Sequence, residues 1–141
     1  MEMKTFNNNR ITFKYPVSWE NEKPDTINNP DCIATLTKGE ENLLNVVMFP
    51  TQTNLDDFKI TMEDMIVDDG GVISESDFVT IAGKDAIRVV AEINTTDIIF
   101  EIYSYVFIID RYIYIFELRT VDPKKETLDE YKELVDSFEV L

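Results

Sequence analysis

The stretch IIFEIYSYVFII at residues 98–109 decides the fold, because its apolar side chains do not alternate with polar ones. Successive side chains of a strand point to opposite faces of the sheet. The apolar residues here occupy both even and odd positions, so both sides of this strand must be buried. The sequence therefore predicts a central strand in a sheet that is covered on each face. The stretch spans about twelve residues and contains Glu101, so it is too short to cross a bilayer.

The chain around this strand has an apolar pattern of period two from residue 72 to residue 120. With a turn at residues 82–85, the pattern predicts an antiparallel meander of four strands, at 72–81, 86–94, 97–109 and 112–120. Earlier in the chain the same pattern predicts strands at 10–15, 32–38 and 43–49, whereas the polar residues 20–31 predict a loop.

Two helices complete the predicted fold. Asn54 is a suitable N-cap for the first helix, and Gly70-Gly71 ends it. The second helix starts either after Asp122-Pro123 or at a capping box that opens with Thr127. The expected buried stripes are Leu55, Phe58, Met62, Met65 and Ile66 in the first helix, and Leu128, Tyr131, Leu134, Val135 and Phe138 around the second. These elements predict one α+β domain over residues 1–141, a layered α/β/α arrangement with a mostly antiparallel sheet of about six to seven strands flanked by helices.

Composition excludes several classes of function. The chain has 141 residues, 44% of them hydrophobic, so a folded domain is expected rather than a disordered acidic chain. Its net charge of −15 opposes the phosphate backbone of nucleic acids, so no nucleic-acid partner is expected. The N-terminus lacks the apolar stretch of a signal peptide, which predicts a cytoplasmic protein without a transmembrane segment. An export signal removed from the chain would leave the same sequence.

Catalytic and metal-binding residues are also scarce. The chain has no histidine, so neither a Ser-His-Asp triad nor a Cys-His pair can be assembled. The single cysteine, Cys32, is expected to be a small buried apolar residue, and one such ligand cannot hold structural zinc. No phosphate-binding motif is present. The sequence therefore predicts a protein that is not an enzyme and has no cofactor.

Acidic residues concentrate between residues 54 and 77, where eight acids accompany one basic residue, Lys59. Asp57, Asp64 and Asp68 share one face of the predicted helix, opposite its apolar stripe. Asp68 and Asp69 end the helix, where the macrodipole disfavours negative charge. Three interpretations are open for this segment. It is a solvated helix face, a docking surface for a partner with a basic surface, or a carboxylate site for Ca²⁺, Mg²⁺ or Mn²⁺.

Two further features allow other interpretations. Glu101 lies inside an apolar strand, where Arg119 or Arg88 could pair with it across the sheet, and a desolvated carboxyl could support acid–base chemistry. Tyr103, Tyr105, Tyr112 and Tyr114 could line a small-ligand pocket, although tyrosines in strands usually serve packing.

Three short motifs resemble the PsbP-like group of folds, which includes photosystem II extrinsic subunits and the Ran-release factor of nuclear import. They are FKYPVSW at residues 13–19, the small-residue turn AGKDA at residues 82–86, and the helix end VDSF at residues 135–138. From the residues themselves, Trp19 is expected to fold back over the sheet and plug the core, although it could also serve as a stacking platform for a ligand. The resemblance implies a prokaryotic member of the group that acts by binding and not by catalysis.

The sequence thus predicts a non-catalytic protein-binding or assembly domain. Its expected contact surface is the acidic region around residues 54–77, with Asp57, Asp64, Asp68 and Asp69 as candidate interaction residues. A divalent-cation or small-ligand binding protein is the alternative, and an enzyme is a weaker one.

Overall fold

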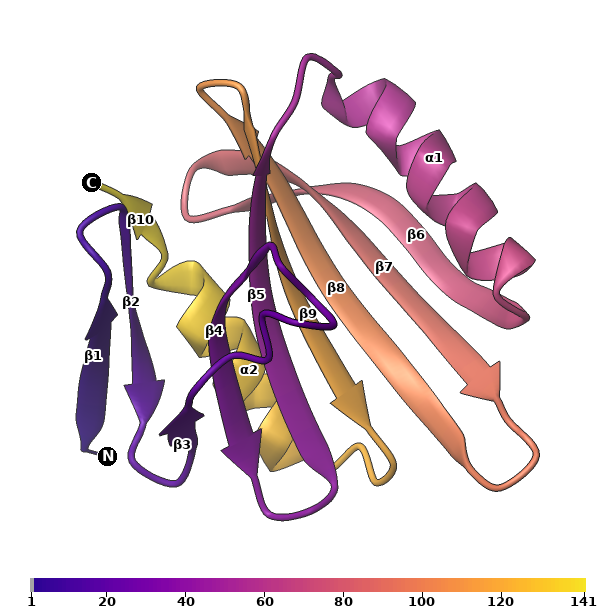
Figure 1. Ribbon diagram of the computed structural model, residues 1–141, viewed down its shortest axis with the longest axis horizontal. Coiled ribbons are helices and arrows are strands. Elements are labelled where there is room, and N and C mark those ends of the chain that lie inside the picture. Colours follow the sequence, from indigo (N-terminus) through magenta and orange to yellow (C-terminus); the bar gives the residue numbers. More distant parts are fainter. Residues whose placement is uncertain (1) are drawn as a thin grey trace.

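The computed structural model describes residues 2–141, and its centre is a seven-stranded antiparallel sheet in the order β3-β4-β5-β9-β8-β7-β6 (Figure 1). The strands are β3 (Glu20–Glu22), β4 (Cys32–Lys38), β5 (Asn42–Pro50), β6 (Gly71–Ile81), β7 (Lys84–Asn94), β8 (Ile99–Ile109) and β9 (Tyr112–Thr120). β8 lies between β9 and β7. The prediction of an interior strand is confirmed for residues 99–109, whereas Ile98 precedes the strand and both Ile98 and Ile99 are exposed.

Two helices, α1 (Leu55–Asp68) and α2 (Lys125–Asp136), cover opposite faces of this sheet (Figure 1). The side chains of β8 show which helix covers each face of the sheet. Val106 packs in one cluster with Met62 of α1. Its neighbours Tyr105 and Phe107 pack in another cluster with Tyr131 of α2. The predicted α/β/α layering is therefore confirmed. No helix within residues 2–141 has the length and apolar content needed to span a membrane.

A second, three-stranded sheet extends the α2 side of the molecule. It consists of β1 (Met3–Asn7), β2 (Ile11–Pro16) and β10 (Glu139–Val140), with β2 in the middle. Phe13 of β2 packs edge-on against Phe116 of β9, with ring centroids 5.8 Å apart. Trp19 follows β2 and is fully buried, so its predicted role as a core plug is confirmed.

The structure corrects two predictions about elements. β3 lies within residues 20–31, which were expected to be a loop, because its backbone pairs with β4 although all its side chains are exposed. α2 begins at Lys125, and neither Asp122 nor Thr127 caps it. Thr127 is buried in the first turn, where its hydroxyl accepts a hydrogen bond from Lys38 Nζ at 3.3 Å.

Candidate functional site

Local interactions fix the orientation of α1. The Oδ1 atom of Asn54 accepts a hydrogen bond from the backbone N–H of Asp57 at 2.9 Å, so the predicted N-cap is confirmed. Phe58 packs on Phe49 of β5 with ring centroids 6.5 Å apart, and Met62 is buried against the sheet. Because this face of α1 packs against the sheet, the opposite face must point to solvent.

Asp57, Asp64 and Asp68 occupy that solvent-facing side, and all three are exposed. Asp69 is also exposed but forms the C-cap, where its backbone N–H bonds to the carbonyl of Met65. The structure thus places three candidate residues on one face and the fourth at the helix end. No basic residue lies in the last turn to offset Asp68.

Glu75 and Asp77 of β6 point to the α2 face of the sheet, because Asp77 lies opposite Arg88, which lies opposite Tyr105 of the α2-side cluster. The acidic surface therefore comprises the acids of α1 and its C-cap: Asp56, Asp57, Glu63, Asp64, Asp68 and Asp69. Together with Glu75 and Asp77 these are the eight acids of residues 54–77. Two of them form ion pairs, Glu63 with Lys59 at 3.2 Å and Glu75 with Arg88 at 3.2 Å. The Ser76 hydroxyl, and to a smaller extent Lys59, hold the pKa of Glu63 below its ordinary value. Within residues 2–141 the other six acids make no ion pair.

Exposed apolar side chains lie among these carboxylates. Ile60, Met65 and Val67 of α1 are 59%, 57% and 58% exposed. The expectation that Met65 belongs to the buried stripe is wrong, because the helix contacts the sheet mainly through Phe58, Met62 and Ile66, and Met65 falls outside that arc. Ile60 and Val67 do not belong to the apolar stripe predicted from the sequence. Their exposure could therefore have been predicted from helical spacing.

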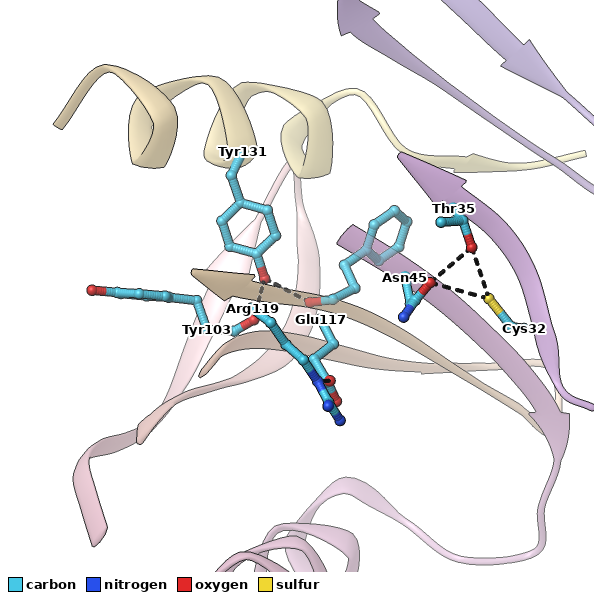
Figure 2. Close-up of polar contacts among 8 residues, drawn as sticks. Cys32, Thr35, Asn45, Tyr103, Glu117, Arg119 and Tyr131 are labelled. Carbon is cyan, nitrogen blue, oxygen red and sulfur yellow. Dashed lines mark hydrogen bonds and ion pairs between the residues drawn. The ribbon is translucent and has the colours of Figure 1, made fainter. Parts of the chain in front are cut away.

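The carboxylates do not form a ready coordination shell. In the part of the chain that the structure describes, residues 2–141, no group of three or more acidic or cysteine side chains is placed to hold a metal ion. Cys32 is buried, as expected, with its Sγ atom 3.5 Å from both Thr35 Oγ1 and Asn45 Oδ1 (Figure 2).

Glu101 does not have the partners that the sequence suggested. Its Oε2 atom accepts a hydrogen bond from the Tyr103 hydroxyl at 2.5 Å, while Arg119 pairs with Glu117 at 2.6 Å. The strand register explains the result for Arg119, which lies opposite Ile102 and therefore on the other face of the sheet from Glu101. Arg88 pairs with Glu75 instead. Burial and the Glu101 carboxylate together raise the pKa of Tyr103.

The tyrosines do not line one common pocket. Tyr103 and Tyr105 line a hollow of about 180 Å³ beside α2. Tyr114 packs on Phe138, and Tyr112 lies under Arg10 at the far end of β9. In Figure 2 the Tyr131 hydroxyl reaches from α2 to the backbone of the sheet, where it donates to the carbonyls of Tyr103 and Phe116 at 3.0 and 2.6 Å. The hollow is smaller than the roughly 300–1,000 Å³ typical of small-molecule sites.

Solved structures share this arrangement at low sequence identity. The solution structure of cyanobacterial PsbP (CyanoP) from Synechocystis sp. PCC 6803 matches with a TM-score of 0.74 over 99% of this chain and 92% of that chain, at 12% identity. The chain has the PsbP-like fold. The same fold is found in LpqN, described as involved in cell envelope biogenesis of Mycobacterium tuberculosis, with a TM-score of 0.73 and 9% identity over 99% of this chain and 90% of that chain.

A mutant of the protein Mog1 also has the PsbP-like fold, with a TM-score of 0.64 and 14% identity over 99% of this chain and 96% of that chain. No family model matches the sequence, and no curated protein matches it. The resemblance predicted from residues 13–19, 82–86 and 135–138 is thus confirmed at the level of the fold.

Proposed function

We propose that this chain is a non-catalytic protein-binding or assembly domain whose acidic surface docks a partner with a basic surface. The observation that carries the proposal is the outer face of α1, where unpaired carboxylates surround exposed Ile60, Met65 and Val67. Charged groups at an interface steer association and set specificity, whereas buried apolar groups supply most of the affinity. The outer face of α1 offers both.

The PsbP-like fold supports the same proposal, since the group that this chain resembles acts by binding and not by catalysis. The sequence adds a chemical argument, because 141 residues without histidine lack the commonest general base. The net charge of −15 favours association with a positively charged protein and disfavours association with nucleic acid.

The test is an affinity pull-down from the native cell extract, with elution by increasing salt. The immobilised proteins are the wild type and a variant that carries Asp57→Lys, Asp64→Lys and Asp68→Lys. We expect the wild type to retain a stoichiometric protein that moderate salt releases, because screening weakens contacts between exposed charges. The variant should retain at least about tenfold less of it, since reversed charges repel a basic partner.

The matched control carries Glu126→Lys, Glu133→Lys and Asp136→Lys. These three residues are exposed and lie in the first turn, the middle and the end of α2. Their positions along α2 match those of Asp57, Asp64 and Asp68 along α1. Both variants change the net charge by the same amount. Circular dichroism should show all three proteins folded. Equal retention by the wild type and the α1 variant would contradict the proposed surface, and equal loss in both variants would indicate an effect of net charge alone.

A further inference from the structure

β6 leaves an unpaired edge beside the acidic surface. It is the last strand of the seven-stranded sheet, and within residues 2–141 it pairs with β7 alone (Figure 1). A bulge between Ile73 and Glu75 interrupts its ladder, so the regular edge runs over residues 75–81. β6 contains neither proline nor lysine, two residues that commonly prevent pairing at a sheet edge. Its outer backbone groups are therefore free to pair with another strand.

A hollow of about 470 Å³ opens beside the C-terminal half of this edge. Its lining residues are Leu55, Asp56, Phe78, Val79, Thr80, Asp85 and Ala86. Asp56 and Asp85 are exposed, and within residues 2–141 neither forms an ion pair. The Nζ atom of Lys59 lies 5.5 Å from the centroid of the exposed Phe78 ring, so this ring already attracts a cation. Apolar walls with carboxylates at the rim suit the stem and charged head of a lysine or arginine.

The charges decide between two possible occupants of the edge. A second copy of this chain would bring its own β6, which contains no lysine or arginine to fill the hollow. It would also bring Glu75 and Asp77 close to their counterparts, and facing like charges destabilise paired strands. A basic extended segment has neither disadvantage, and it suits the net charge of −15.

We propose that residues 75–81 of β6 accept an extended basic segment of the partner as an additional strand, with one of its lysines or arginines in the hollow between Asp56 and Asp85. This inference rests on the proposed function, because it specifies how the basic partner docks. Backbone hydrogen bonds supply affinity in such strand addition, and pockets for alternate side chains supply specificity.

The experiment uses a short synthetic peptide that alternates valine and lysine. Its control is the same peptide N-methylated at consecutive central residues, which keeps the charge but blocks both hydrogen-bonding edges. We expect the first peptide to slow amide hydrogen exchange at residues 75–81 and to bind about tenfold more tightly than its control, because several backbone hydrogen bonds are lost together. The variant Asp56→Asn/Asp85→Asn should weaken binding about fivefold, and Asp57→Asn/Asp64→Asn should weaken it less.

Equal binding of the two peptides would overturn strand addition and leave docking on the acidic surface in place, since charge alone would then explain the affinity. Failure of the unmethylated peptide to bind would also overturn the inference, while the pull-down with the α1 variant tests the proposed function separately. Dimerisation of the chain with the same exchange protection at residues 75–81, seen without peptide by sedimentation, would instead assign the edge to a second copy.

Discussion

Glu130 of α2 is an acidic residue, yet it is only 4% exposed. Its carboxylate pairs with Lys38 Nζ of β4, and its Oε2 atom accepts a hydrogen bond from the Ser18 hydroxyl at 3.2 Å. These contacts join α2 to β4 and to the turn that carries Trp19. Burying an ion is costly unless it is paired, so the effect of losing one partner should exceed that of losing both.

We predict that Glu130→Ala lowers the free energy of unfolding by about 2–3 kcal/mol, because Lys38 is then left without its partner. The value lies below that for a fully buried pair, since the Lys38 side chain is 22% exposed. Urea denaturation measures it. The control Lys38→Met/Glu130→Met should fall within about 1 kcal/mol of the wild type, and an equally large loss in the control would show that packing, not charge, is responsible.

Two tyrosines should make the free energy of unfolding decrease at alkaline pH. Burial raises the pKa of Tyr131 well above its usual value, and burial with Glu101 raises the pKa of Tyr103. Above pH of about 10 the unfolded chain releases these protons while the folded chain keeps them. The free energy of unfolding should therefore be unaffected by these groups below about pH 10 and decrease above it, by up to about 1.4 kcal/mol per pH unit for each tyrosine.

Tyr131→Phe tests this dependence in urea titrations between about pH 9 and pH 11. The variant should lose about 1–2 kcal/mol at neutral pH, because the hydroxyl no longer donates to the carbonyls of Tyr103 and Phe116. Its stability should decrease less steeply than that of the wild type above about pH 10. Identical slopes would mean that Tyr131 does not titrate differently in the folded state.

At the scale of elements, the junction of α1 and β6 sets the position of the acidic surface. Gly70 follows the helix with φ +87°, the left-handed region that favours glycine. Gly71 opens β6 beneath the helix, where an added Cβ would lie 2.9 Å from the carbonyl oxygen of Ile66. The first glycine is needed for its backbone conformation and the second for close packing.

The two glycines should therefore respond differently to alanine. Gly70→Ala should cost about 1 kcal/mol, since a Cβ there meets nothing within 4 Å and only backbone strain opposes it. Gly71→Ala should cost about 2–3 kcal/mol, because the backbone of α1 must move. Thermal unfolding of the two variants measures the difference. Equal effects, or a larger effect at Gly70, would contradict this account of the junction.

The predictability of each element follows from what stabilises it. β4 and β9 were predicted at their observed bounds, because their apolar residues face the core and polar turns flank them. β1 and β10 were not predicted, since most of their side chains are exposed and only pairing with β2 defines them as strands. The start of α2 was also missed, because no side chain caps it and tertiary packing sets its position.

At the scale of the whole molecule, strand order is what the sequence could not supply. The face shared by Asp57, Asp64 and Asp68 follows from helical spacing and was predicted. The edge at β6 depends on β9 inserting between β5 and β8, a long-range pairing that no local pattern encodes. The acidic residues could therefore be found from the sequence, whereas the open edge and the hollow beside them needed the structure.

The most direct test of the acidic surface is hydrogen–deuterium exchange of this chain alone and in complex with the protein that it retains from the cell extract. Docking on the acidic surface predicts slower exchange in α1 and at its C-cap, because bound amides are shielded and α1 opens less often. Exchange in α2 and in β1 should stay unchanged. Protection confined to α2 or to the sheet of β1, β2 and β10, with α1 unaffected, would contradict the account.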